Sequence, residues 1–444
     1  SVTVAPQQTL TDKQFQRMRD AAIKAMNSIG TFAGGCNIQF AFEPGTGRMI
    51  VIEINPRVSR SSALASKATG YPIAKVASKL AVGYTLDELP NEITGDTSAC
   101  FEPSLDYVVT KIPRFNFDKF EGVDEELTTQ MKAVGEVMSI GRTFNESLQK
   151  AWQSLEIGYA GLGADRPDAD PDTVRERLEV PHWDTLLHVR HAFRQGASVE
   201  EVYDITQIDP WFLYQIADLG ALEEEIRQTP LREMGKRNLR AAKRAGFSDE
   251  QIAYLVPDDV SDREVRTHRK ERNVTPTYQV VDTCAGEFPA ETPYYYSSYE
   301  TVNESTVTGR DKVLILGSGP NRIGQGIEFD YSCVHGVKAA QEMGYEALML
   351  NCNPETVSTD FDVADKLYFE PVFWERVQDV IDLEQPEGVI LQLGGQTAIK
   401  LGERFEEDGI EIFGTSYAKM DLVEDRGKFT DILQKLEIPF PPYG

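Results

Sequence analysis

At the start of the chain, the spacing of apolar residues changes from helical to alternating. Between residues 11 and 29 apolar side chains recur every three or four positions and stop at Gly30, which predicts an amphipathic helix packed on a sheet. Two alternating runs follow at 37–42 and 48–55, and the intervening Pro-Gly-Thr-Gly at 44–47 favours a tight turn. The pattern therefore predicts a helix followed by a β-hairpin.

Helical signals dominate the middle of the chain. Before it, the pattern predicts helices at 61–69 and 73–82 and strands at 106–112 and 131–140. From about residue 143 strands become scarce, and residues that cap helix N-termini recur. Four pairs fit capping boxes and one cap precedes a proline: Thr143 with Glu146, Ser198 with Glu201, Ser248 with Gln251, Ser261 with Glu264, and Asp209 before Pro210. The middle is therefore predicted to be a helical domain.

The last part of the chain alternates between strands and helices. A Tyr-rich extended segment at 276–299 and a polar linker at 302–311 lead into it. Strands are predicted at 312–316, 346–351 and 388–393, and helices at 328–343, 374–383 and 397–407. Such alternation predicts a parallel, doubly wound sheet with helices on both faces. The expected fold class is therefore α/β.

One face of the second hairpin strand is polar. Successive side chains of an extended strand point to opposite faces, so residues two apart share a face. The polar positions are Glu53, Asn55 and Arg57, and the apolar positions expected on the other face are Ile50, Ile52 and Ile54. A solvated sheet face would carry similar residues, so two interpretations remain open, a solvated surface and a ligand site.

Counting from the turn adds a residue to this polar face. Gln39 lies seven residues before Thr46 and Glu53 seven after it, so symmetric pairing would place their side chains opposite each other. Oxygen donors of Gln39, Glu53 and Asn55 would then converge, and Mg²⁺ prefers oxygen ligands that include one or two carboxylates. Arg57 would meet phosphate or carboxylate charge beside the ion. A magnesium site is thus the ligand-binding interpretation.

A Gly-rich loop at 317–326 follows the first strand of the alternating part and opens onto a helix. Backbone amides at such a position can bind an anion. The loop does not fit the dinucleotide-binding pattern. Its Gly319 and Gly324 have the spacing of the phosphate-binding loop of nucleoside triphosphatases, but Gln325 stands where that loop requires a lysine. A nucleotide is therefore not the expected ligand of this loop.

Length and charge limit the classes of function. A chain of 444 residues is too long for one hydrophobic core, and its formal net charge of −26 would repel a phosphate backbone. No apolar run approaches the length that crosses a bilayer. Five scattered cysteines without a CxxC pair favour reduced thiols. We expect two or three domains in a cytoplasmic protein, with neither nucleic acid nor a membrane as partner; the acidity also fits a high-salt cytoplasm.

Two separate stretches resemble one enzyme family. The first, IEINPR at 52–57 followed by VSRSSALASKATGYPIA at 58–74, looks like the end of an ATP-grasp domain. The second combines the Gly-rich loop with IEFDYS at 327–332, NCNPETVSTD at 351–360 and GGQT at 394–397. Together they resemble the large chain of carbamoyl phosphate synthetase along essentially the whole sequence.

This resemblance implies three domains. Residues 1–155 would be the C-terminal part of the first ATP-grasp unit, and residues 156–310 a helical oligomerisation domain with a linker. Residues 311–444 would be the pre-ATP-grasp α/β domain of the second synthetase half. The rest of the first ATP-grasp unit, the second unit and the regulatory domain would be missing, so this segment alone is expected to be inactive.

The resemblance also implies roles for single residues. Gln39 and Glu53 would bind ATP and the metal ions, Mg²⁺ or Mn²⁺, and Asn55 would be a further metal ligand. Arg57 would assist the chemical step. Three residues would line the passage that carries the carbamate intermediate: Arg60, Glu328 and Glu355. A helix-capping charge is the alternative for Glu328, and a loop hydrogen bond for Glu355.

The implied activity is that of an ATP-dependent ligase. The family makes carbamoyl phosphate from bicarbonate, glutamine-derived ammonia and two ATP, with K⁺ as a further implied ion. The implied partners are a glutaminase small chain and, through the helical domain, a second copy of the chain. Two alternatives are a non-catalytic assembly module and a biotin carboxylase-like enzyme, which shares the Glu-x-Asn-x-Arg hairpin but would not continue into these later domains.

Overall fold

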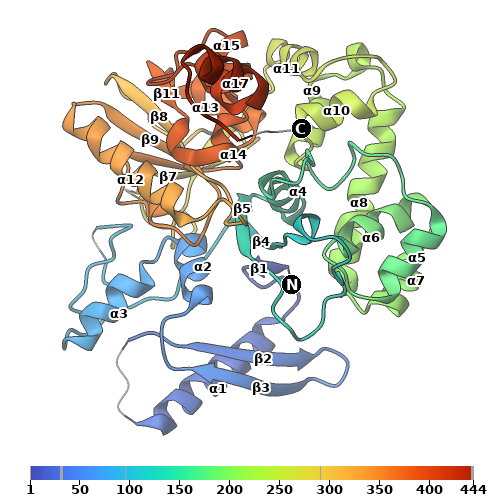
Figure 1. Ribbon diagram of the computed structural model, residues 1–444. Helices are drawn as coiled ribbons and strands as arrows, with labels where there is room; N and C mark the ends of the chain where they lie inside the picture. Colours follow the sequence, from blue (N-terminus) through green and yellow to red (C-terminus); the bar gives the residue numbers. More distant parts are fainter. Residues whose placement is uncertain (1, 31–33, 96, 291, 442–444) are drawn as a thin grey trace.

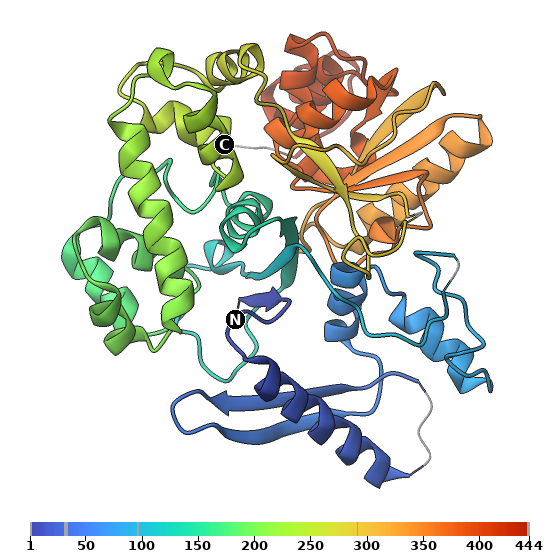
Figure 2. The ribbon, with the colours of Figure 1, turned by 180° about the vertical axis from the view of Figure 1, so that it is seen from behind.

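Three groups of elements, consecutive along the chain, make up the molecule (Figures 1 and 2). The computed structural model describes residues 2–30, 34–95, 97–290 and 292–441. Its strands form a two-stranded sheet β2-β3, a three-stranded sheet β1-β4-β5 and a six-stranded sheet β11-β8-β9-β10-β7-β6. The hairpin and the six-stranded sheet lie at opposite ends, with the β1-β4-β5 sheet between them.

The first group contains the predicted helix and hairpin. Thr11 and Gln14 form a capping box at the start of α1, and Arg17 donates from Nη1 to the carbonyl of Gly47 in the hairpin turn at 2.9 Å. The elements are β1 (Thr3–Ala5), α1 (Asp12–Ile29), β2 (Asn37–Glu43), β3 (Arg48–Asn55), α2 (Arg60–Thr69) and α3 (Ile73–Ala81). The predicted helix, hairpin and two following helices are confirmed.

A β-bulge corrects the expected faces of the hairpin. Gln39 pairs with Glu53 but Phe40 pairs with Val51, so Ile52 is an extra residue without a partner of its own. Because side chains alternate, the bulge places Ile50, which pairs with Ala41, on the same face as Glu53. The expectation that Ile50, Ile52 and Ile54 fill one apolar face is therefore wrong, and Ile50 and Ile52 are exposed.

The rest of the first group is the β1-β4-β5 sheet with a helix that also contacts the other two groups. β4 (Val108–Arg114) pairs antiparallel with both β1 and β5 (Gly135–Gly141), and η1 (Phe117–Lys119) follows β4. α4 (Phe144–Ser154) packs on β4 and β5, and nearly all of its residues are buried. Thr143 caps α4 as predicted, but the carboxylate of Glu146 accepts from the backbone of Arg142 at 2.7 Å instead of completing the capping box.

The middle group is helical, as predicted. Three capping boxes are confirmed at Ser198, Ser248 and Ser261, and Asp209 caps a helix that begins with Pro210. The helices are α5 (Pro171–Glu179), α6 (Thr185–Arg194), α7 (Val199–Thr206), α8 (Pro210–Arg227), η2 (Leu231–Glu233), α9 (Lys236–Arg244), α10 (Asp249–Leu255) and α11 (Asp262–Glu271). Among the described residues, no helix of this or any other group is long and apolar enough to cross a membrane.

The six-stranded sheet is parallel except at one edge. β11, β8, β9, β10 and β7 run parallel, and β6 pairs antiparallel with β7. α12 covers the face with Val313 and Ile315, whereas α13 packs on the face with Leu314 and Leu348. The strands are β6 (Thr277–Val280), β7 (Tyr294–Ser298), β8 (Lys312–Leu316), β9 (Glu346–Asn351), β10 (Lys366–Phe369) and β11 (Gly388–Ile390). The predicted doubly wound sheet is confirmed.

Two details of this group differ from the expectation. The Tyr-rich segment supplies β6 and β7, so the sheet begins before the polar linker. The helix expected at 397–407 is interrupted near Lys400 and Leu401. Its helices are α12 (Ile327–Glu342), η3 (Val357–Thr359), α13 (Trp374–Glu384), η4 (Gln392–Gly394), α14 (Gly395–Ile399), α15 (Gly402–Glu407), α16 (Tyr417–Glu424) and α17 (Arg426–Lys435).

Buried ion pairs join the three groups. Lys150 of α4 donates from Nζ to the carbonyls of Ile140 and Ser297, at 3.0 and 2.6 Å, and to Glu370 Oε1 at 2.9 Å. Neither the Lys150 nor the Glu370 side chain is accessible to solvent. A second network connects the helical group to α13, because Lys243 contacts Glu375 at 2.6 Å. Isolated charges are unfavourable in such positions, so these pairs fix how the groups dock.

The helical group should lose stability in mild acid through His191 of α6. Burial, aided by repulsion from Arg190, lowers the pKa of His191 from 6.5 to about 4, although Asp168 opposes the shift. Between these values the unfolded chain binds the proton more strongly, so lowering the pH from 6.5 towards 4 destabilises the fold. We expect about 1–2 kcal/mol, since the ring is not fully shielded from solvent.

Urea unfolding at pH 7 and pH 4.5 measures this contribution. His191→Gln removes the titrating ring, so the variant should lose less stability between the two pH values than the unmodified protein. An equal loss in both proteins would contradict the assignment.

Candidate functional site

The hairpin brings the predicted metal-binding residues together. Glu53 Oε1 accepts from Gln39 Nε2 at 3.1 Å and from Asn55 Nδ2 at 2.9 Å. Arg57 reaches the same group, because its Nη2 donates to Asn55 Oδ1 at 3.4 Å. Gln39 and Glu53 are solvent-exposed and Asn55 is half-buried. One carboxylate, two carboxamides and a guanidinium therefore form an exposed cluster, which we call the hairpin cluster.

The bulge at Ile52 is needed for this register. Near the turn Glu43 pairs with Arg48, and continuing without a bulge would place Gln39 opposite Ile52. The extra residue shifts the later pairs by one, which brings Gln39 opposite Glu53. Symmetric counting about Thr46 thus predicted the right pair, but the pair arises from a bulge that the sequence pattern did not reveal.

The hairpin cluster contains side chains whose oxygens are of the kind that Mg²⁺ and Mn²⁺ prefer. Such ions are commonly held by one or two carboxylates, with water, phosphate or amide oxygens completing the shell. Glu53 is the single carboxylate. Rotating the terminal amides of Gln39 and Asn55 by half a turn would direct their oxygens, in place of their nitrogens, towards an ion bound at Glu53. No group of three or more His, Cys, Asp or Glu suited to a metal occurs among the described residues. The residues fit an ion shared with a phosphate ligand rather than a closed protein site.

Arg60 and Glu355 come together across two groups of elements. Arg60 begins α2, and its Nε lies 3.5 Å from Glu355 Oε1 in the segment before η3. Burial raises the pKa of Glu355, and so does Glu136 nearby, whereas Arg60 and Lys111 lower it. An open groove passes between the two groups, and its lining residues are Ser59, Arg60, Ala63, Asn321, Ile327, Pro354, Glu355, Thr356, Val357 and Asp360. Two of the three predicted passage residues thus face one groove.

The third predicted passage residue points elsewhere. Glu328 Oε1 accepts from the backbone amide of Gly326 at 3.2 Å, at the N-terminus of α12. This contact is the helix-capping alternative considered for Glu328. Glu355 differs, because its backbone amide makes the loop hydrogen bond, to Asn353 Oδ1 at 2.9 Å, and its carboxylate faces Arg60.

Sequence reasoning missed two charged residues of this region. Glu136 of β5 and Lys111 of β4 form an ion pair at 2.7 Å, and both act on the carboxyl group of Glu355. Neither lies in a stretch with a distinctive pattern, since each is one polar position on an amphipathic strand. Only the packing of β4 and β5 beside the loop after β9 identifies them.

The amides of the Gly-rich loop bind the protein itself. Ser318 donates to Asp330 Oδ1 at 3.0 Å, Gly319 to Asn351 Oδ1 at 3.1 Å, and Ile323 to Asn116 Oδ1 at 3.0 Å. Space is also limited, because a Cβ at Gly317 would lie 2.2 Å from Asn351 Cγ. These three amides are therefore already paired with protein acceptors.

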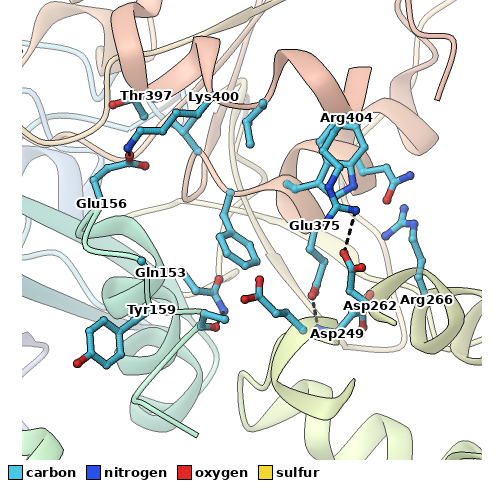
Figure 3. A pocket seen from close by; sticks show the side chains of 18 of the residues that line it. Gln153, Glu156, Tyr159, Asp249, Asp262, Arg266, Glu375, Thr397, Lys400 and Arg404 are labelled. Carbon is cyan, nitrogen blue, oxygen red and sulfur yellow. Dashed lines mark hydrogen bonds and ion pairs between the residues drawn. The ribbon is translucent and has the colours of Figure 1, made fainter. Parts of the chain in front are cut away.

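A cavity of about 320 Å³ lies between the helical group and the α13–α15 region (Figure 3). Its walls carry paired charges. Arg404 lies 3.2 Å from Asp262, Lys400 lies 3.3 Å from Glu156, and the backbone amide of Asp249 donates to Glu375 Oε2 at 2.5 Å. None of the predicted site residues lines this cavity.

Comparison with known families assigns a class to each stretch. Residues 1–89 match the ATP binding domain of the carbamoyl-phosphate synthase L chain. Residues 136–273 match the oligomerisation domain of the carbamoyl-phosphate synthetase large chain, and residues 309–422 match the carbamoyl phosphate synthase preATP-grasp domain. The hairpin cluster thus lies in the stretch that matches an ATP binding domain, and all three matched stretches belong to models of carbamoyl phosphate synthase.

The chain belongs to the carbamoyl phosphate synthase large chain family. The large chains of Archaeoglobus fulgidus and Thermotoga neapolitana are each 55% identical to it, and that of Nostoc sp. is 53% identical. Each alignment covers 100% of this chain, but only 42%, 40% and 43% of the respective relatives. The family and the α/β fold class predicted from the sequence are confirmed, for a chain that spans about two fifths of its relatives' length.

Proposed function

We propose that this chain forms part of a carbamoyl phosphate synthase, the ATP-dependent ligase that makes carbamoyl phosphate from bicarbonate, ammonia and two ATP. One observation carries the proposal: the carboxylate of Glu53 accepts hydrogen bonds from both Gln39 and Asn55 on an exposed face of an ATP-binding domain. A solvated surface would not require two carboxamide side chains to converge on one carboxylate oxygen.

In this proposal the hairpin cluster holds ATP and the metal ion at the first synthetic site. Gln39 and Glu53 contact both, and Asn55 is a further metal ligand. Bound Mg²⁺ or Mn²⁺ would neutralise charge on the phosphate that is transferred. Arg57 is positioned by its contacts with Asn55 Oδ1 and the Val58 carbonyl, at 3.4 and 3.3 Å. Its planar guanidinium would then stabilise charge on the reacting phosphate and bicarbonate.

We further propose that the groove between α2 and the loop after β9 is part of the carbamate passage. Arg60 supplies a cation and Glu355 a half-buried carboxyl group with raised pKa on opposite walls. A carbamate anion would be attracted to Arg60, whereas direct contact with an ionised Glu355 would be repulsive, so Glu355 would act on the anion through Arg60. Glu328 follows the groove-lining Ile327 in the chain, and we retain it in the proposal as a third passage residue at the start of α12.

Partners follow from the same proposal. A glutaminase small chain would supply ammonia, a second copy would bind through the helical group, and K⁺ would be a further ion. We place the enzyme in the cytoplasm.

The match to an oligomerisation domain also supports a second candidate function, that of an assembly module. A biotin carboxylase-like function has no such support, because the three matched domains come from one other family.

Assays of the full-length gene product test the proposed function. With bicarbonate, ammonia and Mg-ATP, we expect carbamoyl phosphate to form with two ATP consumed per molecule. Without ammonia, we expect slow ATP turnover that still depends on bicarbonate. ATP turnover that is independent of bicarbonate would overturn the proposal. The 444-residue chain alone should be inactive in both assays, because it covers only about 40% of its relatives' length.

A further inference from the structure

α2 is held at both ends by the loop after β9. At its N-terminus Arg60 faces Glu355, with 3.5 Å between Nε and Oε1. Near its C-terminus Lys67 donates from Nζ to Asp360 Oδ1 and, at 3.2 Å, to the carbonyl of Thr356. Arg60 and Lys67 are seven residues apart and therefore share one face of the helix. Two charged contacts thus connect the helix that follows the hairpin cluster to the loop that carries Glu355.

The contact at Lys67 is much more enclosed than that at Arg60. The Lys67 side chain is 8% exposed, against 77% for Arg60. Burial lowers the pKa of Lys67, whereas attraction to Asp360 acts in the opposite direction. A buried ammonium group requires an acceptor at a fixed place, so Lys67 restricts the loop more strongly than an exposed pair can.

Further hydrogen bonds hold the same end of α2. Tyr294 of β7 donates from its hydroxyl to the carbonyl of Lys67 at 2.8 Å, and Tyr107 donates to that of Ala68 at 2.7 Å. These bonds hold the C-terminal backbone of α2 against β7 and against the segment just before β4. The side chain of Lys67 then connects this fixed backbone to Thr356 and Asp360, on either side of η3, and both residues line the groove.

We propose that Lys67 is a positioning residue that, through Asp360 and Thr356, keeps the α2 wall and the Glu355 wall of the groove together. The inference rests on the proposed function, because it concerns the passage of carbamate. Carbamate that escapes into water gives bicarbonate and ammonia, with one water consumed, and the ATP used to make it is lost. Holding the two walls together would limit the access of that water, as enclosure does for other labile intermediates.

The ratio of ATP consumed to carbamoyl phosphate formed measures this role in the full-length protein. Lys67→Met keeps the apolar stem but removes the ammonium group, and Asp360→Asn removes the partner charge. Each variant should raise the ratio from about two to about three or more, because part of the carbamate hydrolyses. Asp360→Glu keeps the charge and should retain a ratio near two. A ratio near two in both Lys67→Met and Asp360→Asn would overturn the proposal.

Hydrogen exchange tests the docking without reference to activity. In Lys67→Met and Asp360→Asn, amides of residues 60–69 and 353–360 should exchange about tenfold faster, whereas the helical group should be unchanged. Asp360 is 46% exposed, so Asp360→Asn should fold even if Lys67→Met does not. Unchanged exchange in Asp360→Asn would show that the contact does not hold the wall.

Arg263→Met is the matched control. Arg263 also joins two groups of elements, at 2.6 Å from Glu407 and 2.8 Å from Asp408, but it lies away from the groove. The Arg263→Met variant should change neither the ratio of ATP consumed to carbamoyl phosphate formed nor amide hydrogen exchange at residues 353–360. A raised ratio in this control would overturn the assignment to Lys67. If the unmodified protein makes no carbamoyl phosphate, the proposed function fails, and the exchange data still decide whether Lys67 holds the wall.

Discussion

Glu53→Gln in the full-length protein is expected to reduce bicarbonate-dependent ATP turnover by about 100- to 1000-fold. The substitution preserves shape but removes the only carboxylate of the hairpin cluster, on which Gln39 and Asn55 converge. A metal ion supplies several kcal/mol of transition-state stabilisation. Losing about 3–4 kcal/mol of it corresponds to this range of rates. Steady-state ATP turnover with saturating bicarbonate measures the effect.

Glu43→Gln provides the matched control for this prediction. Glu43 lies on the same hairpin and is exposed, but its carboxylate accepts from Thr46 Oγ1 at 2.5 Å, next to the turn. Its loss should change turnover by less than about twofold, as expected for an exposed residue outside the site. Equal effects of the two substitutions would indicate that hairpin stability, rather than the cluster, limits turnover.

Lys150→Met is expected to cause the largest loss of stability, about 3–5 kcal/mol, because it leaves Glu370 buried without its partner. Burial lowers the pKa of Lys150, and attraction to Glu370 and Glu146 acts in the opposite direction. The same ammonium group also donates to the carbonyls of Ile140 and Ser297. Urea unfolding of the 444-residue chain, followed by circular dichroism, measures the change.

Two comparisons separate this effect from a general loss of charge. Arg175→Met breaks the exposed pair between Arg175 and Glu179 on α5, at 3.1 Å, and should cost no more than about 0.5 kcal/mol. Adding Glu370→Gln to Lys150→Met removes the uncompensated carboxylate and should recover part of the loss. If Lys150→Met costs as little as Arg175→Met, Lys150 does not fix the docking of α4 on the six-stranded sheet.

Local sequence signals predicted most of the elements. Capping residues and turn residues act over three or four positions, so the helix starts at Ser198, Ser248 and Ser261 and the hairpin turn at 44–47 could be read directly. Alternation of strands and helices similarly gave the parallel sheet. The edge strands β6 and β7 were not assigned to that sheet, because pairing between Val280 and Tyr295 depends on contacts that no local pattern specifies.

The candidate site was predictable where one strand carries it. Glu53 and Asn55 are two residues apart on β3, and their contact follows from that spacing, whereas Arg57 lies beyond the end of β3 and reaches Asn55 across a turn. The groove was not predictable from spacing, because Arg60 and Glu355 are far apart in the chain and meet only when the first group docks on the sheet. Lys67 is intermediate, since its position seven residues after Arg60 indicates a shared helix face but not the partner that the face contacts.

The unpaired residue in β3 determines where the hairpin can change length. Removing Ile52 would leave Gln39 opposite Glu53, because Val51 and Glu53 already pair with the adjacent residues Phe40 and Gln39. Removing one residue elsewhere in β3 would leave Glu53 on the wrong face unless the bulge disappeared at the same time. Related hairpins one residue shorter should therefore lack the residue at position 52, and an alignment that places the gap elsewhere would mismatch the binding face.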